Sequence, residues 1–461
     1  MALAKASNIS PHGFDDARVR ALWTREVEAY EAAHPKAKAC HLEARKTMLH
    51  GVPLHWMSQW PGPFPLVADR GRGAELTDID GHRYADFCLG DSGAFFGHAN
   101  EHVARAIARF ATERGSTMML PSEDAVAVSG ELSRRFGLPY WQFTTSATDA
   151  NRFAVRMARM ITARDLILVF NGKYHGSVDE TQVEIDQGRM VPQHGIHPNG
   201  MNHEATTRIV EYNDIEALTA ALEDRKVACV LAEPMLTNIG MVPPAPGFNE
   251  ALREITRRTG TLLILDETHT ICAGPAGCTG EWGLEPDILT LGKVLAGGIP
   301  SAVWGVSADV GAAIERHTGA DGINHYGFGG TLAGNALTLH AMRVTLEKVM
   351  TPENYARMCA LAGRLEEGVA ERIAGFGLPW HVTRIGARVE FLYMPDVPRN
   401  GGEAACARDD AFEALIHIYF LNRGILLSPF HNMALIAPQT QVVDVDLYLE
   451  VFDAYLRELA R

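Results

Sequence analysis

Two charged residues, Asp266 and Lys293, follow closely on short apolar runs of the sequence. Residues 262–265 are Leu-Leu-Ile-Leu and lead directly to the acid, and residues 288–291 are Ile-Leu-Thr-Leu and are followed by Gly292 and the lysine. Runs this short and this apolar are typical of strands buried on both faces of a parallel sheet. Because ligands of such sheets bind beyond the carboxyl ends of the strands, we expect both side chains to face one crevice.

A lysine amine and a carboxylate in one crevice suit the chemistry of pyridoxal phosphate (PLP). The lysine can form a Schiff base with the cofactor aldehyde, and the acid can keep the pyridine nitrogen protonated so that the ring accepts electrons. The two residues alone are equally compatible with an ordinary ion pair at a loop edge. Other parts of the chain must therefore decide between the two interpretations.

A candidate phosphate site stands between a predicted strand at residues 140–145 and a predicted helix at residues 148–162. The connection carries Ser146, Ala147 and Thr148. Free backbone N–H groups at a helix N-terminus bind anions, and hydroxyl groups add hydrogen bonds. An ordinary N-cap by Ser146 explains the same residues.

Aromatic residues follow other predicted elements. Tyr174 comes after a predicted buried strand at residues 166–170 and could stack on a flat ring, although a plain loop tyrosine is the alternative. Residues 51–65 are rich in Pro, Gly and Trp, which excludes a regular helix. This loop either lines a site with His55, Trp56 and Trp60 or packs its aromatic rings beneath itself.

Composition narrows the class of protein. The 461 residues carry a formal net charge of −14, which argues against nucleic acid or an anionic membrane as partner. No apolar stretch is long enough to cross a bilayer and the N-terminus has no signal-peptide core, so we expect a cytoplasmic protein. Cys272, Cys278 and His269 lie close in sequence, but without a paired C-x-x-C we expect no metal.

Alternating strands and helices between residues 140 and 307 predict a doubly wound, mainly parallel α/β sheet. The C-terminal part is predicted to be an α+β module with its own apolar residues. Glycine-rich dinucleotide, P-loop, nucleophile-elbow and zincin motifs do not occur in the sequence, which removes support for those enzyme classes.

Five short motifs together resemble the class III (ω-type) aminotransferases of the fold-type-I PLP superfamily, and within it the glutamate-1-semialdehyde aminomutase-like branch. They are Ser146–Asn151, Tyr174–Gly176, Asp266-Glu267, Gly292-Lys293 and Gly330-Thr331, and the resemblance extends from about residue 64 to the end. It implies a mainly parallel seven-stranded sheet flanked by helices, with a smaller α+β domain built from both ends of the chain. The implied domains are an N-terminal segment at 1–80, a large PLP-binding domain at 81–345 and a C-terminal domain at 346–461.

The resemblance also implies roles for single residues. Lys293 would carry the cofactor as a Schiff base and later move protons, and Asp266 would pair with the pyridine nitrogen. Tyr174 would stack on the ring, with Glu233 near it in a structural role. The phosphate would be held by Ser146, Ala147, Thr148 and, from a neighbouring subunit, Thr331. The enzyme would then be a homodimer with active sites at the interface.

Some positions depart from the pattern of the family. Ala147 and Asp149 replace the usual Gly and Glu, but alanine keeps its N–H for phosphate. Thr268 replaces Val, which makes the second face of the ring less apolar. His269 stands where Gln or Met is common, and could hydrogen-bond the 3′-oxygen of the cofactor and tune the Schiff base.

The substrate pocket departs further. Trp56 and Phe430 occupy positions where the β-amino-acid transaminases of this class carry carboxylate-binding arginines. Arg384 or Arg388 could substitute from another direction. Otherwise the pocket, with Trp60, His55 and His431 beside the two aromatic residues, favours an apolar or aromatic amine.

We therefore predict a PLP-dependent aminotransferase that moves an amino group from an amine or amino acid to an oxo acid or aldehyde by a ping-pong mechanism. The alternative on the same fold is an aminomutase or an amino-acid racemase, because one proton shuttle serves all three reactions. A more distant alternative is a non-catalytic binding protein. The presence of both Lys293 and Asp266 argues against it.

Overall fold

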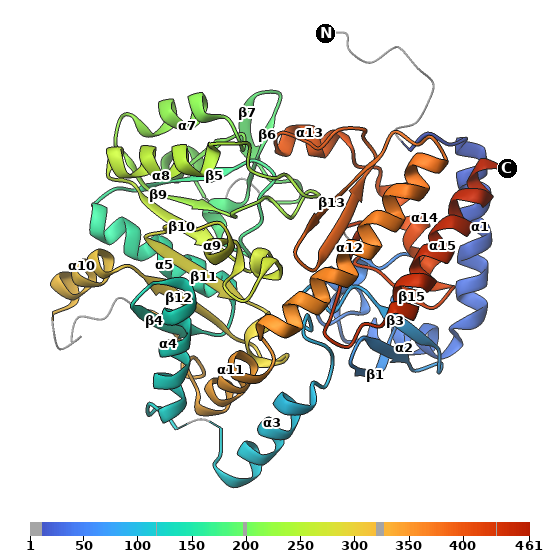
Figure 1. The fold of residues 1–461 in the computed structure, drawn as a ribbon, viewed down its shortest axis with the longest axis horizontal. Coiled ribbons are helices and arrows are strands. Elements are labelled where there is room, and N and C mark those ends of the chain that lie inside the picture. Colours follow the sequence, from blue (N-terminus) through green and yellow to red (C-terminus); the bar gives the residue numbers. More distant parts are fainter. Residues whose placement is uncertain (1–11, 117, 197–200, 320–326, 430) are drawn as a thin grey trace.

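The computed structural model describes residues 12–116, 118–196, 201–319, 327–429 and 431–461. Its centre is a seven-stranded sheet in the order β4-β12-β11-β10-β9-β5-β8 (Figure 1). The strands are β4 (Tyr140–Thr144), β5 (Leu166–Phe170), β8 (Thr207–Val210), β9 (Val227–Ala232), β10 (Leu262–Asp266), β11 (Ile288–Gly292) and β12 (Ala302–Val306). β12 runs antiparallel to β4 and β11, and the other neighbouring strands pair parallel, so the predicted mainly parallel sheet is confirmed.

Helices cover both faces of this sheet because the side chains of each strand alternate between the faces. Ile264 of β10 packs in one apolar cluster with α5 (Ala147–Thr162) and α10 (Ala308–Thr318). Leu263 and Leu265 of the same strand pack in another cluster with α7 (Ile215–Leu222) and α8 (Phe248–Thr259). Burial on both faces explains why β9, β10 and β11 read as continuous apolar runs.

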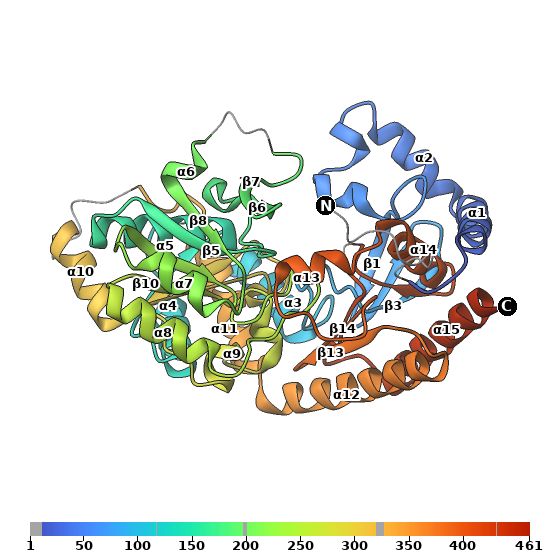
Figure 2. The same ribbon diagram turned by 90° about the horizontal axis from the view of Figure 1, so that it is seen from above.

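The two ends of the chain build a second part of the molecule, on the right of Figures 1 and 2. One sheet has the order β1-β2-β3-β15, in which β3 from the N-terminal part pairs parallel with β15 from the C-terminal part. Another sheet has the order β13-β14-β16. The strands are β1 (Ala68–Arg72), β2 (Glu75–Asp78), β3 (Arg83–Asp86), β13 (His381–Ile385), β14 (Arg388–Leu392), β15 (Ile425–Leu426) and β16 (Met433–Leu435). The predicted domain boundaries themselves stay a prediction.

Helices from both chain ends lie side by side in this part. Those that flank its sheets are α1 (Asp16–Ala33), α12 (Pro352–Gly375), α14 (Asp410–Leu421) and α15 (Val442–Ala460). The buried carboxylate of Glu26 on α1 accepts hydrogen bonds from Asn422 and Arg423, which follow α14. A buried carboxylate is stable only with such partners, so this pairing ties the N-terminal helix to the C-terminal part.

The remaining elements are short or peripheral. Around α11 (Ala336–Lys348) lie α3 (Glu101–Glu113) and α4 (Glu123–Phe136). The others are α2 (Pro35–Ala44), η1 (Leu49–Gly51), η2 (His55–Gln59), η3 (Asp179–Thr181), β6 (Val183–Asp186), β7 (Arg189–Pro192), α6 (His203–Thr206), η5 (Thr270–Ala273), α9 (Gly277–Glu281), η6 (Val294–Ala296) and α13 (Gly401–Cys406). The β6–β7 hairpin was not predicted, although Val183–Asp186 alternates apolar and polar residues. Within the described ranges, no helix combines the length and apolarity that crossing a bilayer requires.

Gly386, in the turn between β13 and β14, holds the C-terminal part against the segment that follows β10. Its φ is +53°, and an added Cβ would overlap the carbonyl oxygen of Cys272 and lie 2.6 Å from Cα of Ala273. Gly81, with φ +100°, has no atom within 4 Å of the same position. We expect Gly81→Ala to cost about 1 kcal/mol of unfolding free energy through backbone strain alone.

Gly386→Ala should cost about 3 kcal/mol or more in chemical denaturation, because the backbone of Cys272 and Ala273 must also move. Equal losses of stability in the two variants would contradict the close approach described for Gly386.

Candidate active site

A cavity of about 510 Å³ lies beyond the carboxyl ends of β10 and β11. Seven of the predicted site residues line it together: Ser146, Ala147, Thr148, Tyr174, Asp266, His269 and Lys293. The prediction that the acid and the lysine share one crevice is therefore confirmed. The topology explains it, because β10 and β11 are adjacent and parallel and both end at this edge of the sheet.

Asp266 is buried and held by three side-chain and backbone donors. Its Oδ2 accepts hydrogen bonds from Asn151 Nδ2 at 2.8 Å and His175 Nδ1 at 3.0 Å, and its Oδ1 accepts one from Thr268 N at 3.1 Å. Burial by itself raises the pKa of this carboxyl, but the three donors outweigh it and the net pKa lies below the ordinary value. Asp266 is thus a stable anion beside the cavity.

Lys293 follows β11 and points its amine into the cavity. Its φ is +58°, which is uncommon for a residue with a side chain and is typical of functional sites. The Nζ donates a hydrogen bond to Asp91 Oδ2 at 2.7 Å and lies 2.9 Å from Nε2 of His269. The amine therefore has an anion on one side and an imidazole on the other.

His269 connects the lysine to the C-terminal part of the chain. Burial, followed by the charge of Lys293, lowers the pKa of His269 to about 3, so its ring is neutral at ordinary pH. Its Nδ1 lies 3.4 Å from Nη1 of Arg388. The same guanidinium donates to the carbonyl oxygen of Thr237 at 2.6 Å and to Glu390 Oε2 at 2.7 Å. Arg388 is buried behind His269 and is already committed to these partners.

The start of α5 lies at the cavity, where the phosphate cradle was predicted. Ser146 is its N-cap and accepts a hydrogen bond from Asp149 N, so the ordinary capping role is real. Two glycines, which have no Cβ, let other segments approach the same turn. A Cβ added to Gly292 would lie 2.9 Å from Cβ of Ala147, and a Cβ added to Gly176 would overlap the hydroxyl of Thr148. The first-turn N–H groups thus face a space bounded by three segments, as an anion site requires.

Two hydroxyl groups at the cavity have no partner within the described chain. Thr268 Oγ1 and Ser301 Oγ are both buried without a hydrogen bond, and both residues line the cavity. Buried polar atoms normally find a partner, so a polar ligand is expected there. An anion cradle, a carboxylate, a lysine and two unpaired hydroxyls together fit the phosphate, ring nitrogen, aldehyde and ring oxygen of PLP.

Tyr174 reaches the cavity with support from two other predicted residues. Its backbone N–H donates to Glu233 Oε1 at 3.2 Å, and the other oxygen of that buried carboxylate accepts from Thr237. The ring of Trp56 meets the ring of Tyr174 edge-on, with centroids 6.0 Å apart. Glu233 does not line the cavity, and its predicted structural role fits this position behind Tyr174.

The other predicted residues lie outside the cavity lining. His431 is buried and pairs with Glu390 at 3.3 Å, while Trp60 is half-buried and His55 is exposed. Thr331 lies in an exposed turn, and its contact with a neighbouring subunit stays a prediction. Phe430 lies outside the described residues. Arg384 is partly exposed and pairs with Glu366, so it is not aimed at the cavity.

Sequence reasoning did not assign roles to Asp91, Asn151 and His175. Asn151 and His175 stand inside two of the recognised motifs. The need of the buried Asp266 carboxylate for hydrogen-bond donors is the signal that could have singled them out. Asp91 lies in a glycine-rich loop at φ +51° and gave no local signal. Its proximity to Lys293 depends on how the loop packs on the sheet.

Comparison with known proteins agrees with this geometry. The family model for class III aminotransferases matches residues 56–441. The chain belongs to this family. Glutamate-1-semialdehyde 2,1-aminomutase of Thermomicrobium roseum is 35% identical over 408 residues, covering 87% of this chain and 93% of that protein. Glutamate-1-semialdehyde 2,1-aminomutase 2 of Bacillus cereus (strain B4264) is 34% identical, covering 80% and 85%.

Solved structures of this family carry the same fold. A glutamate-1-semialdehyde aminomutase from Pseudomonas aeruginosa PAO1 has a TM-score of 0.94 and 56% identity, covering 97% of this chain and all of that one. A β-phenylalanine aminotransferase from Variovorax paradoxus has a TM-score of 0.85 and 27% identity, covering 95% and 97%. The Pseudomonas enzyme is also known in complex with PMP, the aminated cofactor. PLP is therefore the cofactor of this class III enzyme, as predicted.

His175→Ala should weaken the binding of PLP, because Asp266 loses a donor and its pKa rises. A hydrogen bond to a charged group contributes about 1.5–3 kcal/mol, which corresponds to at least about a tenfold higher Kd. The measurement is a PLP titration of the cofactor-free protein by visible absorbance. His102→Ala, on the exposed face of α3, is the matched control and should leave the Kd unchanged. An unchanged Kd in His175→Ala would contradict the role given to this histidine.

Proposed function

We propose that this PLP-dependent enzyme moves an amino group within one substrate, as an aminomutase does. The observation that carries the proposal is the shared cavity in which the Lys293 amine and the Asp266 carboxylate face the start of α5. The names of the relatives at 35% and 56% identity favour intramolecular transfer over the two-substrate reaction that the sequence analysis favoured.

The roles of the residues follow from their chemistry. PLP, when bound, supplies an aldehyde for the amine and a ring that accepts electrons. Asp266 would keep the ring nitrogen protonated, and the N-terminus of α5 would hold the phosphate. The Lys293 amine would accept and return the protons of the substrate. Asp91 and His269 position that amine from its two sides.

The charges of the cavity limit the substrate. No arginine is among its lining residues in the described part of the chain, and the carboxylate of Asp91 lies beside the reactive amine. Because Lys293 and Asp91 form an ion pair, their charges offset each other, and neither attracts a substrate carboxylate strongly. This arrangement favours a substrate whose reacting end carries no carboxylate next to Asp91.

Two-substrate transamination remains a second candidate because of these same charges. The semialdehyde of a dicarboxylic acid keeps one carboxylate, which needs a cationic anchor, and Arg388 is committed to Glu390 and Thr237 while Arg384 pairs with Glu366. Trp56 beside Tyr174 offers an aromatic surface to an apolar amine instead.

A single-substrate assay distinguishes the two reactions. The holoenzyme is incubated with amino aldehydes or diamine precursors, with and without an oxo acid, and products are followed by mass spectrometry. Intramolecular transfer predicts turnover without the oxo acid and no loss of nitrogen from a ¹⁵N-labelled substrate. Turnover that starts only when an oxo acid is added would overturn the aminomutase proposal in favour of transamination.

Lys293→Ala is the variant that tests the PLP assignment behind both reactions. It should lose turnover and the covalent cofactor adduct that borohydride traps on the wild-type chain, as seen by intact mass. Lys173→Ala provides a poor control because that lysine is buried, so Lys348→Ala at the end of α11 is used instead. Full activity in Lys293→Ala would refute the assignment.

We also propose that the enzyme is a homodimer in which Thr331 faces the cofactor of the neighbouring subunit. Large apolar side chains next to this turn support an interface: Met118, Met119, Leu120 and Leu332 are all at least half exposed. The backbone of Leu337 bonds Ser116, which brings the two segments together. Surfaces of this kind are typical of contacts between subunits.

Leu332→Glu should therefore shift the protein from dimer toward monomer in sedimentation velocity, because a buried unpaired charge opposes association. Leu42→Glu is the control, since Leu42 is equally exposed on α2 at 59% against 60% for Leu332. A wild-type chain that sediments as a monomer at all concentrations would exclude the dimer.

A further inference from the structure

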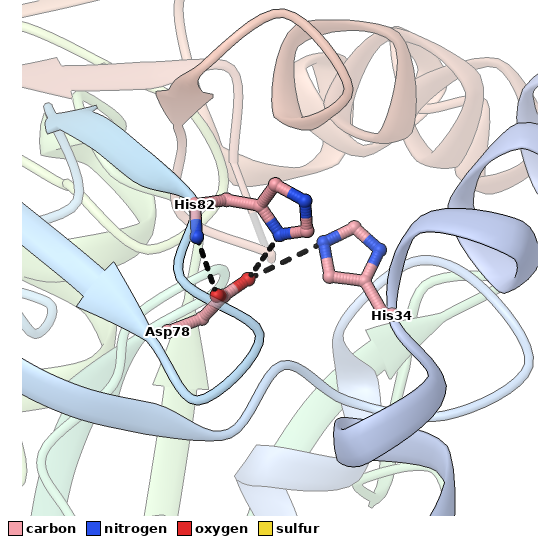
Figure 3. A group of neighbouring side chains, drawn as sticks. All are labelled: His34, Asp78 and His82. Carbon is pink, nitrogen blue, oxygen red and sulfur yellow. Dashed lines mark hydrogen bonds and ion pairs between the residues drawn. The ribbon is translucent and has the colours of Figure 1, made fainter.

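Three side chains outside the cavity lining converge on a single point, as Figure 3 shows. His34 stands at the junction of α1 and α2, and Asp78 and His82 flank the turn between β2 and β3. Oδ2 of Asp78 lies 3.0 Å from Nδ1 of His82 and 3.4 Å from Nε2 of His34. All three ligand-type atoms lie within 4.8 Å of one another.

Two acceptor atoms at this point, on His34 and Asp78, share one hydroxyl donor. His34 uses Nδ1 toward the carbonyl oxygen of Tyr30 at 2.7 Å, so a neutral ring presents a lone pair at Nε2. The hydroxyl of Tyr84 lies 2.9 Å from that Nε2 and 2.8 Å from Asp78 Oδ2. One hydroxyl proton cannot serve both acceptors. Asp78 Oδ2 also has Nδ1 of His82 at 3.0 Å, so when the Tyr84 hydroxyl donates to Asp78 the Nε2 lone pair of His34 is left for another ligand.

The surroundings hold the three residues in place. The contact of His34 with Tyr30 aims Nε2 at the cluster, as second-layer carbonyls do for metal-binding histidines. Asp78 is fixed through its other oxygen, which accepts from the backbone N–H groups of Gly81 and His82 at 2.8 and 2.9 Å. His34 and Asp78 are buried, whereas the side chain of His82 is 42% exposed and leaves a path from solvent.

We propose that His34, Asp78 and His82 form a binding site for a divalent transition-metal ion, with Zn²⁺ as the best fit. Two imidazole nitrogens and one carboxylate oxygen are a ligand set that Zn²⁺ accepts. Ligands at tetrahedral angles and about 2.1 Å from the ion lie roughly 3.4 Å apart, close to the two separations from Asp78 Oδ2. Water or the Tyr84 hydroxyl completes the coordination.

The charge of the neighbourhood favours a cation. Asp80, two positions after Asp78, presents a second carboxylate and accepts hydrogen bonds from the backbone of Lys36 and Ala37. The ion would join the α1–α2 junction to the β2–β3 hairpin. The sequence analysis expected no metal because it considered only Cys272, Cys278 and His269.

The test is zinc binding by the holoenzyme, which does not depend on which reaction the cavity performs. The protein is freed of metal by chelator and dialysis, titrated with ZnCl₂ by calorimetry and analysed for bound zinc by plasma mass spectrometry. We expect the wild type to bind one zinc ion more per chain than His82→Ala, and the variant to have at least a tenfold higher Kd for zinc. The melting temperature should rise with zinc only in the wild type. His102→Ala should behave as the wild type.

Tyr84→Phe separates a metal site from a plain hydrogen-bond network. Removing the hydroxyl leaves all three protein ligands, so the variant should still bind zinc, and zinc should restore the stability that it loses. Equal zinc affinity in the wild type and His82→Ala, or no zinc bound by the wild type at micromolar concentrations, would overturn the proposal. Asp78→Asn is not needed for the decision, because loss of a buried carboxylate can itself disturb folding.

Discussion

The buried carboxylate of Asp266 is the constraint on which the active site depends. An ion at the end of a central strand is tolerated only with donors around it, and here they come from α5, from the loop after β5 and from its own loop. Those donors fix the positions of the segments that carry the phosphate cradle and Tyr174. The hydrogen-bond donors that one buried charge requires thus hold the segments around the cavity in place.

A second line of charges connects this site to the C-terminal part. Asp91 and His269 contact the Lys293 amine, Arg388 backs His269, and Glu390 accepts from Arg388. His431 closes the line by pairing with Glu390. Each group is buried or half-buried, so its charge is balanced by its neighbours and not by water. The C-terminal part therefore shapes the environment of the lysine through Arg388 and Glu390, although neither residue lines the cavity.

Much of the site could be predicted because its residues follow strand ends. A strand buried on both faces has an apolar sequence that stops where the ligand site begins, so Asp266 and Lys293 are marked by local sequence alone. The substrate side could not be predicted in this way. Asp91, Trp56 and Arg388 come from loops and from another sheet, and their meeting depends on packing that no short pattern encodes.

By itself, the sequence determined the alternation of strands and helices, the mainly parallel sheet and the place of Asp266 and Lys293 at one sheet edge, because apolar periodicity and strand-end residues are local properties. Only the tertiary structure decided which charges surround Lys293, and that His34 meets Asp78 and His82. Those contacts join residues far apart in the chain. Their distances depend on how whole elements pack, and packing reflects the shapes of many side chains at once.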